Sequence, residues 1–207
     1  MESNRRSPWT VGILIFADVE VLDFCGPFEV FATTGAAAGA DTGDAPFHVF
    51  TVAESAATVR CRGGLLVQPH YTLADHPPLD LLVVPGGWGT RRAVHNAALL
   101  DWIAAQDATT QLTLSVCTGA FLLAERGLLD GRAATTHWAS LDRLQATYPQ
   151  ITVQRDTRYV DAGRIITSAG VSAGLDMALH VVRRLCGPAV AAGTARSMEY
   201  AWSTETD

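Results

Sequence analysis

Apolar and polar positions along this chain form two kinds of pattern. Runs of strand length, either continuously apolar or alternating, lie at 11–16, 47–52, 64–68, 81–84 and 112–116. Apolar residues at helical spacing predict helices over 97–108, 137–148, 172–185 and 189–200. Two further strands, over 152–159 and 164–167, flank the turn signal Asp161-Ala-Gly163 and predict a hairpin. Strands and helices therefore alternate through most of the chain.

The segment after the first strand is less regular. Residues 17–25 read as a loop that carries Asp23, and Gly26-Pro27 predicts the start of a short helix over 28–33. Residues 35–46 are rich in Ala, Gly and Asp, which favours a flexible surface connection.

This alternation predicts an α/β fold with a mostly parallel central sheet and helices on both faces. Ligands of such sheets bind at the carboxyl ends of the strands. The segments that follow three of the strands carry Asp23, Gly86-Gly87 and Cys117, so these residues can converge on one site. We expect a flexible tail over 1–9 and a single domain over 10–203.

Composition narrows the class of protein. The chain has 207 residues and a net charge of −6, and its arginines are scattered, which argues against a nucleic-acid partner. It has no apolar run long enough for a membrane span, and its first ten residues lack the apolar stretch of a signal peptide. The four cysteines, Cys25, Cys61, Cys117 and Cys186, lie far apart, which fits a reducing cytoplasm better than a disulfide framework.

Cys117 ends a β-rich run, and small residues and an amphipathic helix follow it. This places the cysteine at a strand-to-helix corner, the geometry of a nucleophile elbow. Amides at the start of the helix favour an anion, so they would stabilise a thiolate of lowered pKa. Cys117 therefore fits a nucleophile, and it equally fits a buried structural cysteine.

An ordered set of short motifs resembles the ThiJ/PfpI superfamily, which has the class I glutamine-amidotransferase-like fold, over roughly residues 10 to 200. The motifs are Gly12-Ile-Leu-Ile-Phe16, Leu22-Asp23 with Gly26-Pro27, Val84-Pro-Gly-Gly87, Ser115-Val-Cys-Thr-Gly119, Ala133-Ala-Thr-Thr-His-Trp138 and Ala173-Gly-Leu-Asp176. The resemblance implies a flavodoxin-like three-layer sandwich in which Cys117 is the elbow nucleophile.

Within the superfamily the chain most resembles the isonitrile hydratases, through Leu22-Asp-Phe-Cys-Gly-Pro27 and the long stretch Gly127 to Trp138. In that family a cysteine attacks the terminal carbon of an isocyanide, and water completes conversion to an N-substituted formamide. The resemblance assigns the nucleophile to Cys117 and the carboxylate to Asp23. Thr118 follows the cysteine as it does in the hydratases, and we expect Thr118 and Gly87 to contact the substrate or a developing oxyanion.

The sequence departs from other branches of the superfamily. PfpI-like proteases carry His after the nucleophile, where this chain has Thr118, and DJ-type members carry Glu where it has Asp23. The motifs also resemble the amidotransferase-like domain of AraC-type regulators. Those proteins continue into a helix-turn-helix module, and this sequence ends at Asp207, so no such module is expected.

Each candidate residue has a structural alternative. Asp23 is a general acid beside the thiolate, or else a solvated loop acid or helix cap. Gly87 offers amides to the substrate, or else makes a tight turn. His137 is the third residue of a catalytic triad, or else a packed structural histidine beside Trp138. Trp138 belongs to the hydrophobic core or to the wall of the pocket. Glu29 is left outside the catalytic set. No ligand spacing predicts a metal, and no GxGxxG predicts a nucleotide cofactor.

Three functions remain in competition. The first is cofactor-free hydration of a small isocyanide. The second is glyoxalase-like or other small-electrophile chemistry at the same thiol, and the third is a non-catalytic ligand or redox sensor. We also expect a homodimer with the site near the subunit interface, because the resemblance implies one. A second reason is that many apolar residues lie close to Asp23 in the sequence, which favours their burial against a partner. These residues are Val19, Val21, Leu22, Phe24, Cys25, Phe28 and Phe31.

Overall fold

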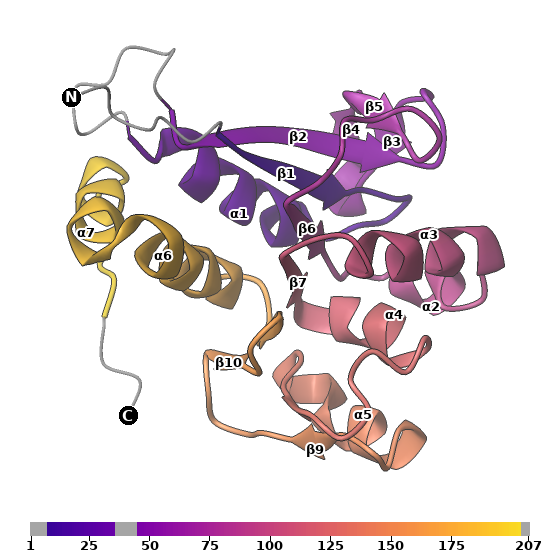
Figure 1. Cartoon of the computed structure of the whole chain (residues 1–207). Coiled ribbons are helices and arrows are strands. Elements are labelled where there is room, and N and C mark those ends of the chain that lie inside the picture. The colour runs from indigo at the N-terminus through magenta and orange to yellow at the C-terminus, as the bar shows by residue number, and fades with distance from the viewer. Residues whose placement is uncertain (1–7, 36–44, 204–207) are drawn as a thin grey trace.

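The computed structural model describes residues 8–35 and 45–203. Within them, seven strands form one sheet in the order β10-β11-β7-β6-β1-β2-β5 (Figure 1). Their bounds are β1 Trp9–Leu14, β2 Phe47–Ala53, β5 Tyr71–Thr72, β6 Leu81–Val84, β7 Leu112–Val116, β10 Tyr159–Asp161 and β11 Ile165–Ser168. Every neighbouring pair is parallel except β10 with β11, which confirms the predicted mostly parallel sheet.

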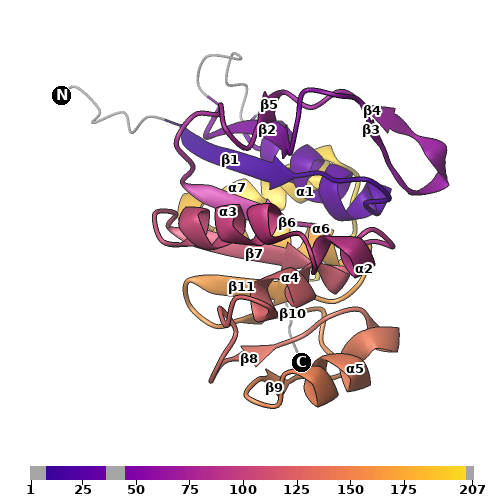
Figure 2. The same ribbon diagram turned by 90° about the vertical axis from the view of Figure 1, so that its right-hand side faces the viewer.

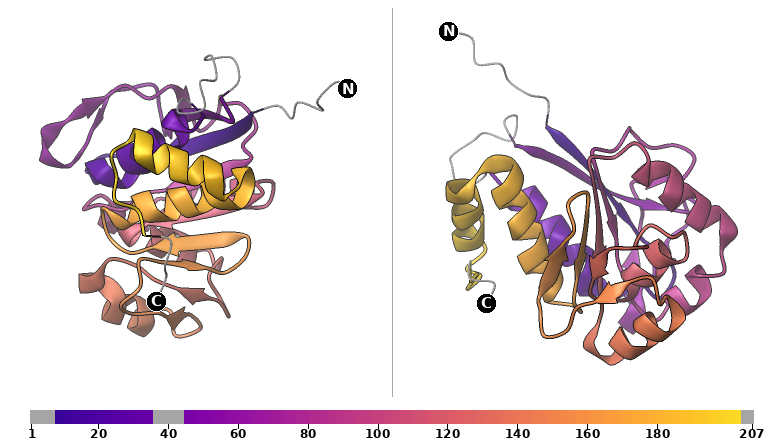
Figure 3. Two further views of the ribbon diagram at one scale, coloured as in Figure 1. Left: turned by 90° about the vertical axis from the view of Figure 1, so that its left-hand side faces the viewer. Right: turned by 60° about the horizontal axis from the view of Figure 1, so that its bottom comes forward.

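Helices cover both faces of this sheet, as predicted. One face carries α1 (Val21–Thr33), α6 (Ala173–Cys186) and α7 (Pro188–Ser197), seen in front in the left view of Figure 3. The other face carries α2 (Thr90–Ala93), α3 (Ala97–Asp107), α4 (Ala120–Ala124) and α5 (Leu141–Thr147), seen in front in Figure 2. A hydrophobic core lies on each face of the sheet, and alternate residues of a strand point into one core or the other. In β6, Leu81 and Val83 pack toward α1 and α6, while Leu82 and Val84 pack toward α3 and α4.

Two small ribbons lie outside the main sheet. An antiparallel pair joins β3 (Val59–Arg60) to β4 (Leu66–Val67), and a parallel pair joins β8 (Ala133–Ala134) to β9 (Thr152–Val153). The predicted strand over 64–68 is therefore β4, which pairs with β3 in a ribbon outside the main sheet. The predicted strand over 152–159 divides into β9 and β10, although the hairpin of β10 with β11 is confirmed.

The largest difference from the sequence prediction concerns the segment before Pro27. Residues 17–25 were expected to form a loop, but α1 begins at Val21 and Pro27 lies inside the helix. Proline there leaves the Asp23 carbonyl without its helical donor. Burial of Phe24, Val30 and Phe31 in the core stabilises the helix despite that loss. Asp23 is consequently held in the first turn of a helix.

Smaller differences occur at other element ends. The helix predicted over 137–148 begins with the 3₁₀ turn η4 (Trp138–Ser140), and Trp138 is 77% exposed, so it is not a core residue. Strand β1 starts at Trp9 rather than at Val11. Most of the predicted tail (1–7) and of the predicted surface connection (36–44) lies outside the described residues, so the domain limits 1–9 and 10–203 stay a prediction.

Candidate active site

Cys117 lies at the corner between β7 and the 3₁₀ turn η3 (Cys117–Gly119), which leads into α4. Its backbone has φ +56°, a conformation that residues other than glycine seldom adopt. Hydrogen bonds hold it there: the Cys117 amide donates to the Ala169 carbonyl at 3.1 Å, and the Thr136 hydroxyl donates to the Cys117 carbonyl at 2.7 Å. The predicted strand-Cys-helix elbow is therefore present, with backbone strain of the kind that clusters at functional sites.

Two glycines allow the end of β6 to approach this elbow. A Cβ on Gly119 would lie 2.1 Å from the Val84 carbonyl oxygen. A Cβ on Gly86 would lie 2.5 Å from the Thr118 amide nitrogen and 2.9 Å from Oδ2 of Asp23. Only a residue without a side chain fits at either position, and this close approach brings the Asp23 carboxyl to the elbow.

Asp23 reaches the site from the first turn of α1 and is completely buried. The Gly86 amide donates to its Oδ2 at 3.0 Å. The other carboxyl oxygen, Oδ1, has no hydrogen-bond partner within residues 8–35 and 45–203. Asp23 is thus neither a solvated loop acid nor a side-chain cap of α1, since no such cap bond forms at the start of that helix.

Burial raises the pKa of Asp23 from 3.8 to about 7. The hydrogen bond from Gly86 lowers the pKa, and so do the neighbouring Cys117 thiol and Val171 amide, while the charge of Glu20 raises it. The loss of hydration raises the pKa more than these contacts lower it, because few hydrogen-bond donors of the protein replace the water that would solvate the carboxylate. The group therefore exchanges its proton near neutral pH, as an acid-base catalyst requires.

The Cys117 thiol differs from the sequence prediction. A lowered pKa was expected, but burial, followed by the negative charge of Asp23, raises the pKa of the thiol to about 12. The Thr118 and Val171 amides oppose this rise without cancelling it. Burial thus raises the pKa of both groups of the pair, and each charge also disfavours ionisation of the other.

Thr118 and Gly87, both predicted to contact substrate, bind each other. The Gly87 amide donates to Thr118 Oγ1 at 3.0 Å. The single proton of the Thr90 hydroxyl is shared between the Gly87 carbonyl at 2.7 Å and Thr118 Oγ1 at 3.1 Å. The Gly87 amide is thus engaged with Thr118, and the amide that faces the sulfur belongs to Thr118 itself. Contact of Gly87 and Thr118 with a substrate stays a prediction.

Val171 and Thr90 are the residues of this site that the sequence analysis did not identify. Val171 has φ +51°, an outlier for a β-branched residue, and its amide acts on both Asp23 and Cys117. Gly86, in contrast, belongs to the glycine pair that the sequence analysis placed near Asp23 and Cys117, and nothing in the sequence singled out Val171 or Thr90.

His137 and Glu29 do not join the pair. The His137 ring packs on Gly170, where an added Cβ would lie 2.3 Å from ring atom Cδ2, and its Nδ1 accepts from the Ala139 amide at 3.2 Å. These contacts support the structural interpretation of this histidine. Glu29 is exposed and accepts from the Thr33 hydroxyl at 2.9 Å.

Residues 8–35 and 45–203 contain no group of three or more His, Cys, Asp or Glu side chains placed to hold a metal ion. The same residues contain no helix with the length and apolar character needed to cross a bilayer.

Comparison with known proteins places this geometry in context. The model of the DJ-1/PfpI family matches residues 10–184. The chain is 36% identical to isonitrile hydratase of Pseudomonas putida over 191 residues, which cover 92% of this chain and 78% of that protein. A second relative is the HTH-type transcriptional regulator CdhR of Pseudomonas aeruginosa. The two sequences are 41% identical over 112 residues, and this match covers 54% of this chain and 33% of the regulator.

Known structures agree with the fold. A THiJ/PfpI family protein from Pseudomonas syringae superposes with a TM-score of 0.84 at 29% identity, covering 100% of this chain and 81% of that one. Drosophila melanogaster DJ-1beta superposes with a TM-score of 0.79 at 20% identity, covering 95% of this chain and 100% of that one, a similarity of fold alone.

Proposed function

The chain belongs to the DJ-1/PfpI family, and from that premise we propose that it hydrates isocyanides to N-substituted formamides. The observation that carries the proposal is the buried pair of Asp23 and Cys117, which holds one exchangeable proton near neutral pH beside a sulfur nucleophile. The similarity to isonitrile hydratase across most of the chain supports the choice of substrate class.

The first step adds the S–H group across the terminal carbon of R–N≡C. The Asp23 carboxylate accepts the thiol proton while Sγ of Cys117 bonds to that carbon, and the same carboxyl then delivers the proton to it. The product is a thioimidate, R–N=CH–S–Cys117, and no external acid is consumed. A carboxyl that ionises near pH 7 suits both halves of this transfer. The raised pKa of Cys117 agrees with a thiol that is deprotonated only as it reacts.

The second step releases the formamide. Water adds to the thioimidate carbon as Asp23 accepts a water proton and passes it to the substrate nitrogen. The C–S bond then breaks as the hydroxyl becomes the formyl carbonyl, and the hydroxyl proton returns through Asp23 to the sulfur. The Thr118 amide, which faces the sulfur, stabilises the departing thiolate. The overall change is R–N≡C plus water to R–NH–CHO.

The direct test incubates the purified protein with cyclohexyl isocyanide and, in parallel, with methylglyoxal. We expect N-cyclohexylformamide from the wild type, none above background from Cys117→Ala, and no lactate from methylglyoxal. Lactate without formamide would favour glyoxalase-like chemistry at the same thiol.

A non-catalytic sensor is the second candidate, and the similarity to CdhR favours it. The chain spans only 33% of that regulator, so its regulatory role does not transfer as a whole. Saturable binding of isocyanide or another small electrophile without turnover, in the assay above, would support the sensor and contradict the hydratase.

The pH dependence of hydration follows from Asp23. Below its pKa the carboxyl is protonated and cannot accept the thiol proton, so we expect kcat/KM to rise with pH and level off above a midpoint near 7. Steady-state rates between about pH 5.5 and 8.5 measure this midpoint. A profile that is flat or falls over that interval would contradict the role of Asp23.

The predicted homodimer also stays a proposal, and its physical basis changes. Val19, Phe24 and Phe31, expected at the interface, are buried within the chain's own core. Exposed apolar side chains are instead those of Leu22, the residue before Asp23, and Trp88, the residue after Gly87, and the β3–β4 ribbon adds Leu65 and Leu66. The two groups adjoin, because Arg62 between β3 and β4 lies over the Trp88 ring at 5.7 Å and pairs with Glu20 at 2.6 Å.

We expect sedimentation equilibrium at micromolar concentration to give the dimer mass, and Leu66→Asp to shift the protein toward monomer. A monomer with full isocyanide activity would remove the reason for placing the site at an interface.

Cytoplasmic location likewise stays a prediction. Its support is chemical: the four cysteines are free in the structure, and catalysis by Cys117 needs a reduced thiol. The partner proposed here is a small-molecule isocyanide, with neither nucleic acid nor membrane involved.

A further inference from the structure

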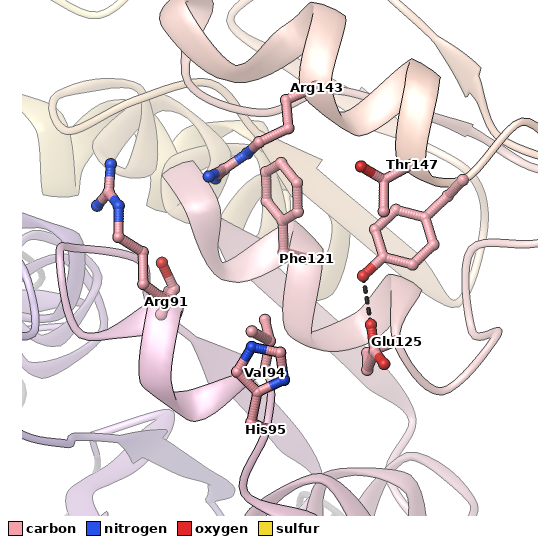
Figure 4. A pocket seen from close by; sticks show the side chains of 9 residues that line it. Arg91, Val94, His95, Phe121, Glu125, Arg143 and Thr147 are labelled. Carbon is pink, nitrogen blue, oxygen red and sulfur yellow. Dashed lines mark hydrogen bonds between the residues drawn. The ribbon is translucent and has the colours of Figure 1, made fainter.

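A cavity of about 210 Å³ opens between α2, α4 and α5, on the sheet face opposite α1 (Figure 4). Neither Asp23 nor Cys117 lines it, because both pack on the side of α1 and α6. The lining residues are Thr90, Arg91, Val94, His95, Phe121, Glu125, Arg143, Thr147 and Tyr148. The cavity is therefore distinct from the thiol site.

Two guanidinium groups line this cavity without a carboxylate partner. Within residues 8–35 and 45–203, neither Arg91 nor Arg143 forms an ion pair, whereas Arg92, the next residue of α2, pairs with Asp18 at 2.7 Å. Each unpaired guanidinium lies over an aromatic ring at 4.3 Å from its centroid: Arg91 over Trp88, and Arg143 over Phe121. Ring stacking orients both groups while leaving their N–H donors free for an anion.

At the other end of the cavity a carboxylate is already hydrogen-bonded within the protein. Glu125 is the one carboxylate among the lining residues, and it accepts the Tyr148 hydroxyl at 2.5 Å. Figure 4 shows Glu125 on one side of Phe121 and the guanidinium groups of Arg91 and Arg143 on the other. Between the two ends the wall is apolar, formed by Val94 and by the rings of Phe121 and Tyr148. The cavity thus has a cationic end and an apolar body.

We propose that this cavity is a second ligand site, which binds a small organic acid. The carboxylate lies between Arg91 and Arg143, and the apolar body packs against Phe121 and Val94. The volume is below the roughly 300 Å³ at which drug-sized pockets begin, so the ligand is small. A planar carboxylate matches the fork of a guanidinium better than a spherical anion does.

The cavity also adjoins the elbow. Thr90 forms part of its wall, and the Thr90 hydroxyl is the group that donates to Gly87 and Thr118. Thr90 therefore connects the wall of the cavity to the hydrogen bonds that support the turn after Cys117.

Isothermal titration of the full chain with benzoate tests the site. We expect saturable binding with one benzoate per chain. Arg91→Gln and Arg143→Gln should each weaken it at least about tenfold, since each removes a charge-assisted hydrogen bond. Arg92→Gln is the matched control, with the same change of charge on the same helix, and should bind as the wild type does. Benzamide, which lacks the charge, should bind at least about tenfold more weakly.

Two further variants keep the result decisive. Thr147→Phe fills the cavity from the exposed end of α5 without changing charge, and should abolish binding. Cys117→Ala should bind benzoate as the wild type does, whether or not isocyanide hydration is found. The proposal is wrong if benzoate shows no saturable binding, if Thr147→Phe binds it normally, if Arg92→Gln weakens it as Arg143→Gln does, or if inorganic phosphate binds as tightly.

Discussion

Asp23→Asn is expected to abolish isocyanide hydration and, at the same time, to stabilise the folded protein at neutral pH. The amide keeps the volume and can still accept from Gly86, but it cannot cycle a proton, so we expect turnover to fall by about a thousandfold or more. Activity and stability should therefore move in opposite directions, as they do where a buried charge is kept for chemistry.

The stabilisation follows from proton linkage. Asp23 ionises near pH 7 in the folded chain and near pH 3.8 when unfolded, so between these values the folded state holds the additional proton. The free energy of unfolding then falls as pH rises through this interval, by an amount on the order of 4 kcal/mol. Asparagine has no charge to bury, so its advantage should be largest at pH 8 and should shrink toward pH 4.

Urea unfolding of wild type and Asp23→Asn at pH 5 and pH 8 measures this effect. Glu29→Gln is the matched control, because it removes an exposed carboxylate from the same helix and should change neither stability nor turnover appreciably. An asparagine variant that is less stable than wild type at pH 8, or one that hydrates isocyanides at the wild-type rate, would rule out the buried, proton-transferring carboxyl.

Gly119→Ala is expected to be among the most destabilising single-methyl additions in the chain. Helix propensity alone would favour alanine by up to about 1 kcal/mol. The added Cβ, however, would lie 2.1 Å from the Val84 carbonyl oxygen and 2.9 Å from that of Pro85, both rigid backbone atoms. We expect a loss of about 3 kcal/mol in the free energy of unfolding, together with loss of hydration because the elbow must move.

Gly131→Ala provides the control for this substitution. Gly131 has φ +70° and no atom within 4 Å of an added Cβ, so its replacement should cost only about 1 kcal/mol of backbone strain and leave turnover intact. If Gly119→Ala were as stable as wild type, or if both alanine variants lost equal stability, the tight contact between β6 and the elbow would not hold.

The local pattern of the sequence was sufficient for much of the fold. Apolar runs located β6 and β7, helical spacing located α3, α6 and α7, and the order Leu112 to Ala124 placed Cys117 at a strand-to-helix corner. These features depend on residues adjacent in the chain, so periodicity and the small residues after Cys117 suffice to predict them. The start of α1 was missed because Pro27 is a strong local signal for a helix start, and the burial that overrides it comes from distant segments.

The chemistry of the pair depended on the tertiary structure. Sequence placed Asp23 and Cys117 in one site and predicted a lowered pKa for the thiol, whereas burial in the folded chain raises the pKa of both groups. A pKa depends on how far water is excluded, and that exclusion arises where α1, the loop at Gly86 and the turn at Val171 meet. The sequence determined which groups are present and in what order along the chain, and only their packing decided how strongly burial raises their pKa values.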